Sequence, residues 1–379
     1  MEKIKLGDLC KPSAGQIKED EDKLIDYIDI SSVDNETKKV TGYQTITFGE
    51  SPSRARKAVK RGNILVSTVR PNLNAVALLE EDTPNVSVAS TGFCVLESKD
   101  DVDPRFIFNF CKSKPFIDDM VSQATGASYP AVSDKIVRSA LIPKYSYQEQ
   151  QHISNVLDKL AGIIDSRRIE LQKLDNLIKA RFVELFGSIS NNKFGYEVMT
   201  LQDVCEPIKD GTHKTPTYTA DTVNGYKFLS SKDVTSGKVD WNHLKYIPEE
   251  LHKELYKRIS PKKGDILLAK NGTTGVAAIV DRDDVFDIYV SLALLCPLGM
   301  VTSEYLCSAV NSIETKHQFD SSLKGIGVPN LHLGEIKKTK IVVPPIEAQE
   351  LFADFVKQVD KSKVVAEKNW NIHNICLVA

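Results

Sequence analysis

An internal repeat with a period of about 200 residues constrains this 379-residue chain more than any other feature. Five landmarks recur in the same order in both halves. They are residues 6–10 with 201–205, 60–65 with 262–267, 126–130 with 325–329, 142–143 with 343–344, and Gln150 with Gln349. A period this long exceeds a solenoid unit and suits a duplicated domain with its connector. The sequence therefore predicts two copies of one architecture.

Each copy mixes short apolar runs with loops rich in Gly, Asn and Thr. The runs at 64–66 and 266–268 predict strands, and residues 106–111 predict a helix, so each copy is expected to be an α+β globule. A strand bounded by proline follows each globule, at 140–143 and 341–345, and precedes a segment without internal proline. We expect globules at 1–145 and 188–345, with long helices at 146–187 and 346–379.

The segment from about 147 to 186 has a heptad seam with a period of 3.5 residues. Eight of its ten seam positions are apolar, and Arg167 and Arg181 are the exceptions. These arginines either set the register by pairing with a facing carboxylate, or lie at the seam edge with their charges in water. The ten positions are 153, 157, 160, 164, 167, 171, 174, 178, 181 and 185. About 40 helical residues would span about 60 Å, which predicts a strut.

A helix with one apolar stripe must bury that stripe against a partner. The segment after the second globule offers Leu351, Phe352, Phe355, Val356 and Val359 at helical spacing. We therefore expect the two long helices to pair antiparallel as a coiled coil, with a globule at each end.

Composition restricts the class of protein but not its activity. The chain is 41% hydrophobic and 26% charged with a net charge of −2, which fits two or three globular domains and gives no indication of a nucleic-acid partner. No apolar run approaches the ~18 residues of a membrane helix, and the amino terminus lacks a signal-peptide core, so we expect a cytoplasmic protein. The seven cysteines form no Cys-x-x-Cys pair and are interpreted as small core residues.

Four motifs and the duplicated plan carry a resemblance that covers essentially the whole chain. The motifs are the helix entries at 142–153 and 343–349, the helix end Lys-Ala-Arg-Phe-Val-Glu-Leu-Phe-Gly at 179–187, and the strand phrase Gly-Asp-Ile-Leu-Leu-Ala-Lys at 264–270. Together they resemble the specificity subunits of type I restriction-modification systems. The resemblance implies two α+β target recognition domains joined and separated by two long antiparallel coiled-coil helices.

The same resemblance implies a function without intrinsic chemistry. Each recognition domain would read one half of a bipartite, asymmetric site in double-stranded DNA, and the helices would set the unread spacer and dock two methyltransferase subunits. Restriction subunits driven by ATP would join through those subunits. S-adenosylmethionine, Mg²⁺ and ATP would be bound by the partners, so no cofactor or metal is expected on this chain.

The distal helix departs from the family pattern. Only 30 residues follow Gln349, against 37 between Gln150 and Gly187, and residues 370–379 abandon the heptad charge pattern. We therefore expect this helix to be truncated or altered at its end.

Two basic clusters are the local features that suit DNA phosphates. Residues 51–72 contain six basic side chains and no acidic one, and the second copy carries a similar group. A solvated basic face is the alternative. The candidate contacts are Arg54, Arg56, Lys57, Lys60, Arg61, Lys262 and Lys263.

Polar loops after the two aligned strands suit base reading, which needs side chains with paired donors and acceptors. Two further loops, at 125–130 and 209–216, are additional candidates, and ordinary turns are the alternative for all four. The residues expected to face DNA are Ser67, Arg70, Asn72, Asn74, Ser128, Tyr129, His213, Lys214, Lys270, Asn271, Thr273 and Thr274.

Catalytic motifs are missing from the sequence. There is no P-loop, residues 325–327 do not complete a dinucleotide fingerprint, and His243 and His252 lack an H-E-x-x-H arrangement, so both are expected on a partly exposed helix face. Two alternatives stay open. One is an enzyme whose site is assembled from distant residues, and the other is a coiled-coil scaffold with two protein-binding globules.

Overall fold

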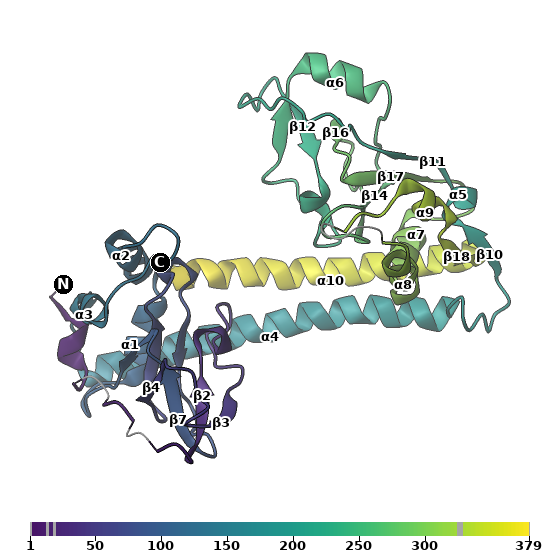
Figure 1. Cartoon of the computed structure of the whole chain (residues 1–379). Helices are drawn as coiled ribbons and strands as arrows, with labels where there is room; N and C mark the ends of the chain where they lie inside the picture. Colours follow the sequence, from purple (N-terminus) through teal and green to yellow (C-terminus); the bar gives the residue numbers. More distant parts are fainter. Residues whose placement is uncertain (1, 13–14, 18–19, 324–328, 379) are drawn as a thin grey trace. The chain divides into compact units, whose positions relative to one another are not determined.

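The computed structural model describes residues 2–12, 15–17, 20–323 and 329–378, with side chains described as far as residue 367 (Figure 1). The chain divides into two compact units. The first comprises Met1–Arg167 with Asn369–Ala379, and the second comprises Arg168–Lys368. Each unit contains both helices and strands, which confirms the expected α+β class.

Among its described residues, the first unit holds three small sheets, three short α-helices and three 3-10 helices, labelled η, before the long helix α4. The sheet orders are β1-β9, β3-β2-β7-β4 and β6-β5-β8. The elements are β1 (Lys3–Lys5), η1 (Leu6–Leu9), β2 (Leu24–Ile28), η2 (Ile30–Ser32), β3 (Gln44–Thr47), β4 (Ala55–Ala58), β5 (Ile64–Ser67), η3 (Pro71–Leu73), β6 (Val76–Leu78), β7 (Val86–Ser90), β8 (Phe93–Leu96), α1 (Pro104–Lys112), α2 (Lys114–Gln123), α3 (Asp134–Ser139), β9 (Leu141–Pro143) and α4 (Tyr147–Phe186).

The second unit repeats this plan between the end of α4 and the second long helix, α10. Its sheet orders are β10-β18, β11-β17-β14-β15 and β13-β12-β16. The elements are β10 (Glu197–Thr200), α5 (Leu201–Val204), β11 (Cys205–Asp210), β12 (Tyr226–Leu229), η4 (Ser231–Val234), β13 (Lys245–Ile247), α6 (Glu249–Tyr256), β14 (Ile266–Ala269), β15 (Ala277–Ile279), β16 (Phe286–Ile288), β17 (Leu292–Pro297), α7 (Ser303–Val310), α8 (Ile313–Ser322), α9 (Leu333–Lys338), β18 (Lys340–Val343) and α10 (Ile346–Val378).

The two units share one topology, which confirms the duplication predicted from the landmarks. The antiparallel pair β1-β9 corresponds to β10-β18, and the parallel pair β2-β7 corresponds to β12-β16. The antiparallel trio β6-β5-β8 corresponds to β15-β14-β17. The units differ where β4 of the first is replaced by α6 of the second, so the duplicated frame carries different insertions.

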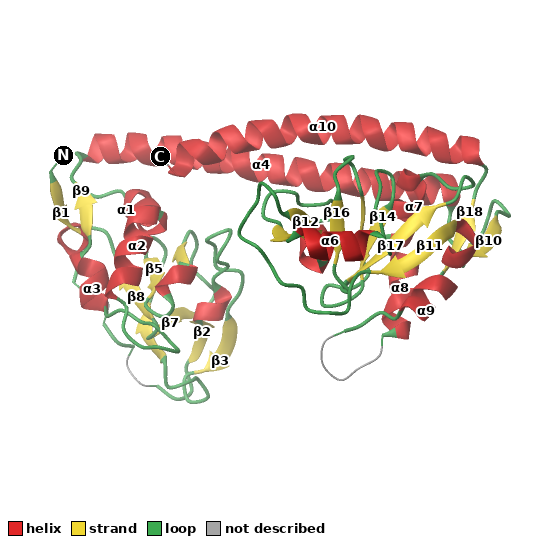
Figure 2. Cartoon of the chain, turned by 90° about the horizontal axis from the view of Figure 1, so that it is seen from above, coloured by secondary structure: helices red, strands yellow, loops and turns green. Residues whose placement is uncertain are grey.

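The strands of each antiparallel trio are almost entirely buried. Figure 2 shows two of them in each unit, β5 and β8 in the first and β14 and β17 in the second. In β14, Ile266 and Leu268 enter one apolar cluster, while Leu267 and Ala269 enter another. The strand β5 divides its residues between two clusters in the same way. Because successive side chains alternate between sheet faces, a strand covered on both sides has a continuous apolar run. This explains why both strands stand out in the sequence.

A buried glutamine ties each long helix to its globule. The Oε1 of Gln150 accepts a hydrogen bond from the backbone N–H of Asp103 at 3.1 Å, and Asp103 is the N-cap of α1. In the second unit, Gln349 accepts from the N–H of Thr302 at 2.9 Å, and Thr302 is the N-cap of α7. Each amide also donates to a backbone carbonyl five residues earlier, that of Tyr145 or of Pro344. The repeated glutamine is therefore a structural joint.

The helix α4 carries the predicted seam. All ten seam positions are half-buried, and most of the remaining positions are exposed. Within the second unit the facing element is α10, where Phe182 packs edge-on against Phe352 with ring centroids 5.6 Å apart and Asp175 pairs with Lys363 at 2.7 Å. Higher residue numbers on α4 therefore meet lower ones on α10, so these segments run antiparallel, as predicted.

Of the two arginines in the seam, Arg181 has contacts that can be described. Arg181 pairs with Glu184 of its own helix at 2.9 Å, and its guanidinium lies 5.9 Å from the ring centre of Phe355 on α10. The buried Lys363 of α10 makes an ion pair with α4, which the sequence of α4 alone does not reveal.

The helix α10 has 33 residues, against 40 in α4, and its backbone stays helical through Val378. Residues 370–378 therefore belong to the helix, although they lack the heptad charge pattern. No helix in the part of the chain that the structure describes is both long enough and apolar enough to cross a membrane.

Candidate DNA-reading surface

Two loops of the first globule that were predicted separately are joined by backbone hydrogen bonds. The N–H of Arg70 donates to the carbonyl of Pro130 at 2.7 Å, and the N–H of Val132 donates to the carbonyl of Thr68 at 2.9 Å. The loop after β5 and the loop before α3 therefore form one surface feature. Its exposed side chains include Arg70, Asn72 and Ser128.

The guanidinium of Arg70 stacks on the ring of Tyr129, with its carbon 4.8 Å from the ring centre. The tyrosine is 69% exposed, so this cation–π pair is presented to solvent. Arg70 has a left-handed backbone conformation with a φ of 49°, which residues other than glycine rarely adopt. Such conformations persist only where their surroundings enforce them, and they cluster at binding sites.

The second globule builds the same loop pair at the equivalent place. The N–H of Leu331 donates to the carbonyl of Lys270 at 2.8 Å, and that of Gly272 donates to the carbonyl of Pro329 at 3.3 Å. Asn271 is half-buried in this loop, Thr274 is half-buried and Thr273 is exposed. The rest of the repeated landmark, residues 325–328, lies outside the described residues.

Two side chains predicted to contact DNA, Lys57 and Lys270, form ion pairs within their own globules. The ammonium of Lys57 donates to the carbonyl of Phe93 at 2.7 Å and pairs with Asp134 at 2.7 Å. Lys270 is buried with a 7% exposed side chain and pairs with Asp210 at 3.3 Å. The expectation that Lys270 faces DNA is therefore corrected, because its charge is neutralised beneath the surface, whereas Lys57 is half-buried and its ammonium is already paired.

Two predicted polar side chains are also internal. The hydroxyl of the buried Ser67 donates to the carbonyl of Val69 at 2.9 Å, and the amide of Asn74 donates to the carbonyl of Cys111 at 2.9 Å. Both therefore hold the loop in shape, which corrects their predicted role as base contacts. They were predicted because the sequence does not show which way a loop side chain points.

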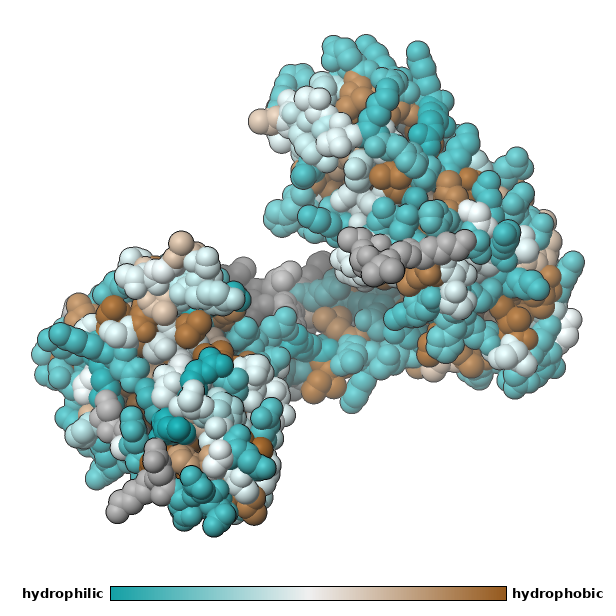
Figure 3. Space-filling view, viewed as in Figure 1, coloured by the Kyte–Doolittle hydropathy of each residue, from teal (hydrophilic) through white to brown (hydrophobic). Residues whose placement is uncertain are grey.

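The remaining predicted cations lie at the surface of their globules. Acidic side chains compete for three of them, since Lys60 pairs with Glu97 at 3.2 Å, Lys263 with Asp283 at 3.7 Å and Lys214 with Glu254 at 3.7 Å. Figure 3 shows mainly hydrophilic side chains with small apolar patches on the visible face of each unit. The exposed residues are Arg54, Lys60, Arg61, Lys214, Lys262 and Lys263, and Arg56 is half-buried over the ring of Phe48.

A cluster in the second globule joins residues that the sequence places far apart. The carboxylate of Asp210, at the end of β11, lies 3.1 Å from Nε2 of His213, 3.2 Å from a guanidinium nitrogen of Arg258 and 3.3 Å from the ammonium of Lys270. His213 was predicted as a contact, Asp210 lies in the candidate loop 209–216, and Arg258 belongs to the basic group of the second copy, but the sequence did not predict that these three side chains meet. No linear spacing connects them, because 48 residues separate Asp210 from Arg258.

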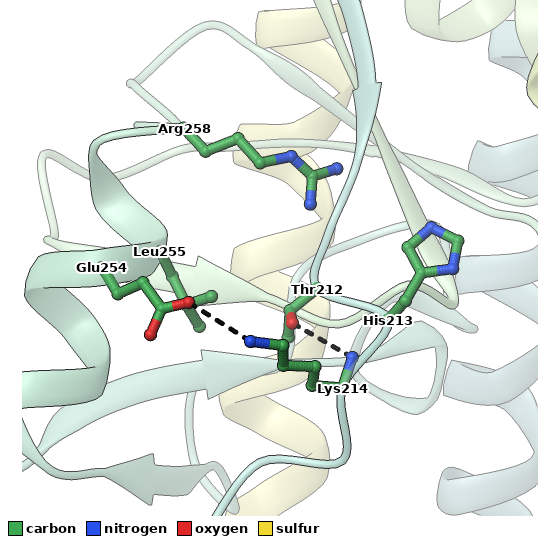
Figure 4. A pocket seen from close by; sticks show the side chains of 6 residues that line it. All are labelled: Thr212, His213, Lys214, Glu254, Leu255 and Arg258. Atoms are coloured by element: carbon green, nitrogen blue, oxygen red, sulfur yellow. Dashed lines mark hydrogen bonds and ion pairs between the residues drawn. The ribbon is translucent and has the colours of Figure 1, made fainter.

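A pocket of about 220 Å³ adjoins this cluster (Figure 4). In it, the ammonium of Lys214 reaches toward the carboxylate of Glu254, at 3.7 Å. The lining side chains are Thr212, His213, Lys214, Glu254, Leu255 and Arg258. The pocket therefore offers hydrogen-bond donors and an acceptor together.

Both histidines expected on a partly exposed helix face are placed differently. His252 lies on α6 but is buried, with Nδ1 2.7 Å from the carboxylate of Asp287 and its ring stacked 3.7 Å from that of Tyr226. His243 lies in the loop before β13, with a side chain that is almost fully exposed. The expectation was wrong for both, since helical spacing does not report which neighbours pack on a helix.

The cysteines described by the structure are free thiols, and all but the half-buried Cys296 are buried. Burial raises the pKa of Cys10 to about 11 and those of Cys94 and Cys205 to about 12, so these thiols stay protonated near neutral pH. Their interpretation as core residues is confirmed within the described part of the chain. Among the described residues, no three His, Cys, Asp or Glu side chains form a group able to hold a metal ion.

Comparison with known proteins connects this geometry to a family. The profile of the type I restriction modification DNA specificity domain matches residues 1–176 and 194–373. The specificity subunit of the type I restriction enzyme MjaVIII from Methanocaldococcus jannaschii is 25% identical over 292 residues, covering 72% of this chain and 67% of that protein. The EcoBI specificity subunit of Escherichia coli is 22% identical over 291 residues, covering 70% of this chain and 61% of that protein.

The fold agrees with these matches. A solved structure from work on complex assembly and conformational transition of the type I R-M system covers 100% of this chain with a TM-score of 0.61 and 21% identity, and 95% of that chain is covered. The chain spans about two thirds or less of the length of the two specificity subunits. Because the profile matches both halves and nearly the whole sequence, the chain belongs to the type I restriction modification DNA specificity domain family.

Proposed function

We propose that this chain recognises DNA sequence for a type I restriction-modification complex and that each globule reads one half of a bipartite site. The observation that carries the proposal is the loop pair built by the same backbone hydrogen bonds in both globules, with different side chains on each. Because the backbone arrangement is the same in both loop pairs and the side chains on the loops differ, the two globules suit two different half-sites. The domain limits proposed are 1–145 and 188–345 for the readers, and 146–187 and 346–379 for the helices.

The contacts proposed for the first globule are the exposed ones. Arg70, held flat by Tyr129, suits the O6 and N7 acceptors of guanine in the major groove. Asn72 and Ser128 lie in the same loop pair, and Arg54, Lys60 and Arg61 would neutralise nearby phosphates. Each globule would read about 3–5 base pairs, with the half-sites about one helical turn, ~34 Å, apart.

Methylation and cleavage would belong to other subunits. Two methyltransferase subunits would dock on the long helices, and ATP-dependent restriction subunits would join through them. The raised pKa values of Cys10, Cys94 and Cys205 keep these core thiols protonated, so none of them is proposed as a nucleophile. The two loop pairs favour DNA over a pure protein scaffold.

The test is to coexpress the chain with the methyltransferase subunit encoded beside it and to map methylated adenines on plasmid DNA by single-molecule sequencing. The expected result is methylation of one split motif with a fixed unread spacer. Arg70→Ala should change one half-site only, while Lys114→Ala, an exposed lysine of α2 in the same globule, should leave the motif intact.

Three outcomes would contradict the proposal. One is no complex and no methylation. Another is a motif without a spacer. The third is activity of the isolated chain that depends on a metal or a methyl donor, which would instead favour the enzyme alternative.

A further inference from the structure

A loop of the second globule, residues 218–225, presents an apolar side chain to solvent at its tip. The tip residue, Val223, is 88% exposed. The carboxylate of Asp221 accepts hydrogen bonds from the backbone N–H groups of Val223 and Asn224 at 2.9 and 3.0 Å, and from the amide of Asn224 at 2.8 Å. Gly225 lies so close that a Cβ there would be 2.3 Å from the carbonyl oxygen of Asp221. These contacts hold the tip in one shape without burying it.

The base of the same loop is fixed to the sheet beside β13. The N–H of Thr219 donates to the carbonyl of Tyr246 at 2.9 Å. The ring of Tyr218 packs edge-on against the ring of the buried Phe228 on β12, with centroids 6.0 Å apart, and is still 43% exposed. Tyr218 is therefore an anchored aromatic ring at the surface.

Lys245 of β13 lies over this ring. Its ammonium is 4.2 Å from the centre of the Tyr218 ring, which is a cation–π contact. The lysine is exposed, and within the described part of the chain no hydrogen-bond acceptor or carboxylate binds its ammonium. The N–H donors of Lys245 therefore have no competing partner, while the ring restricts where they lie. Such ordering before a ligand arrives reduces the entropic cost of binding.

The first globule presents Arg70 on Tyr129 in a similar way, but the second globule does not repeat that contact at the equivalent place. Gly272 takes the position of Arg70, because the N–H of each donates to the proline carbonyl of its own loop pair. The neighbouring Lys270 is buried. Within the described part of the second loop pair there is thus no exposed cation, and Lys245 supplies one, with its aromatic ring, from another element.

An exposed valine beside a free ammonium fits the edges of bases better than it fits a phosphate, which offers no apolar surface. In the major groove, guanine offers O6 and N7 as acceptors, and thymine offers a methyl group to apolar side chains. We propose that loop 218–225 and β13 read bases in the half-site of the second globule, with Lys245 on guanine, Val223 on the methyl group of a thymine and Tyr218 as the positioning residue. The inference rests on the proposed function and deepens it.

The first globule carries a different side chain at the equivalent position. In the sheet orders, β13 and β12 correspond to β3 and β2. Phe228 of β12 faces Lys245, and Tyr27 of β2 faces Gln44. Both aromatic residues are 2% exposed, so they occupy similar places in their sheets. The equivalent of Lys245 is a neutral glutamine, so changes to Lys245 should affect one half-site only.

The test uses the full chain coexpressed with its methyltransferase subunit and compares methylated motifs position by position. The wild-type motif should contain a guanine and a thymine in the second half-site. Lys245→Ala should raise methylation of sites with other bases at one guanine position about fivefold to a hundredfold relative to the cognate site, since a good contact to guanine supplies discrimination of this size. The first half-site should not change.

The other two side chains give independent measurements. Val223→Ala should relax a thymine position. Uracil in place of that thymine should weaken binding of a DNA duplex to the wild-type complex about threefold to fivefold, through loss of one buried methyl group, and should not change binding to the Val223→Ala complex. Tyr218→Phe keeps the ring and should keep the motif, whereas Tyr218→Leu should relax the guanine position. A merely structural role of Tyr218 would lower the Tm without changing the motif.

Two exposed residues of α8 in the same unit serve as matched controls. Lys316 is an exposed lysine, and Ile313 is a 73% exposed apolar residue. Lys316→Ala and Ile313→Ala remove the same kinds of group as the two test substitutions and should leave the motif unchanged.

Two results would overturn the proposal. One is a motif that is identical in wild type, Lys245→Ala and Val223→Ala. The other is a uniform loss of methylation across all sequences in Lys245→Ala with a weaker salt dependence of DNA binding, which identifies a phosphate contact instead. If the wild-type chain methylates no split motif, the failure lies with the proposed function itself rather than with this loop.

Discussion

Single buried side chains decide how each globule is attached to its long helix. Gln150 and Gln349 satisfy the first free N–H at the start of α1 and α7, and each also donates to a carbonyl of the strand-to-helix connection. A buried amide that serves two backbone groups leaves both unsatisfied when it is removed. The recurrence of this residue at one place in each half therefore has a physical cause.

Replacing Gln349 with alanine should lower the free energy of unfolding of the second unit by about 1–3 kcal/mol, because a backbone N–H and the carbonyls of Met300 and Pro344 lose their partners. Urea unfolding followed by circular dichroism measures the effect. Gln358 is an exposed glutamine on the same helix, and Gln358→Ala should change stability by less than about 0.5 kcal/mol. Equal effects of the two substitutions would contradict the role of Gln349 in holding α10 to its globule.

The carboxyl group of Asp287 should make the stability of the second unit depend on pH. Burial raises its pKa, and the hydrogen bond with His252 offsets the shift only in part. A carboxyl with a raised folded pKa contributes stability that is complete below its unfolded pKa of about 3.9 and is lost as the pH rises through the raised value. Asp287→Asn, which does not titrate, should therefore gain stability relative to wild type as the pH rises through that window.

Urea midpoints measured from below pH 4 upward would check this prediction. The exposed Asp283 provides the control, because Asp283→Asn should keep the pH dependence of the wild type. A difference between wild type and Asp287→Asn that is constant with pH would show that burial of the charge is not the cause.

Among the elements, the pairing of α4 with α10 depends on one aromatic cluster at the base of the second unit. The fully buried Phe352 contacts the rings of Phe182 and Phe186, with centroids 5.6 and 5.4 Å apart. The neighbouring Leu351 is 71% exposed. Helical geometry thus places two adjacent apolar residues in opposite environments, although their spacing in the sequence predicted that both belong to the apolar stripe.

Phe352→Ala should therefore destabilise the second unit by about 3–5 kcal/mol through lost burial and a residual cavity. Leu351→Ala should have an effect within about 0.5 kcal/mol, since the side chain is already in water. Chemical unfolding of both variants measures the contrast. A similar loss for both would mean that α10 is rotated about its axis relative to the observed contacts.

At the scale of the whole molecule, each unit has its own apolar core around an equivalent central sheet. Leu96 and Leu295 are both fully buried and face Ile64 and Ile266 respectively, so they occupy the same place in the two copies. Large chains with separate cores often unfold in more than one transition. The duplication therefore provides a matched pair of mutations in one chain.

Leu96→Ala should lower hydrogen-exchange protection in the first unit, and Leu295→Ala in the second, each by about 2–5 kcal/mol of local stability. Exchange measured by mass spectrometry on peptides from both units distinguishes the effects. If either substitution lowers protection equally throughout the chain, the two units unfold as one cooperative structure.

The sequence by itself determined the duplication, the α+β class, the long helix with its seam and the antiparallel partner stripe. These features can be predicted from the order of the repeated landmarks and from the spacing of apolar residues. That spacing depends on local backbone geometry and on the need to bury apolar faces. The sequence also located the loops after β5 and β14, because the continuous apolar runs end where those strands end.

Tertiary structure alone decided which of the candidate side chains are exposed and so available to contact DNA. Lys57 in β4, Ser67 at the end of β5, Asn74 and Lys270 are polar residues in or near the predicted surface, yet their side chains form hydrogen bonds and ion pairs within the globules. The pocket beside Asp210 also depends on it, because its walls come from segments that only the folded sheet brings together. Whether a charge faces a neighbour or solvent is set by three-dimensional packing, which no spacing along the chain records.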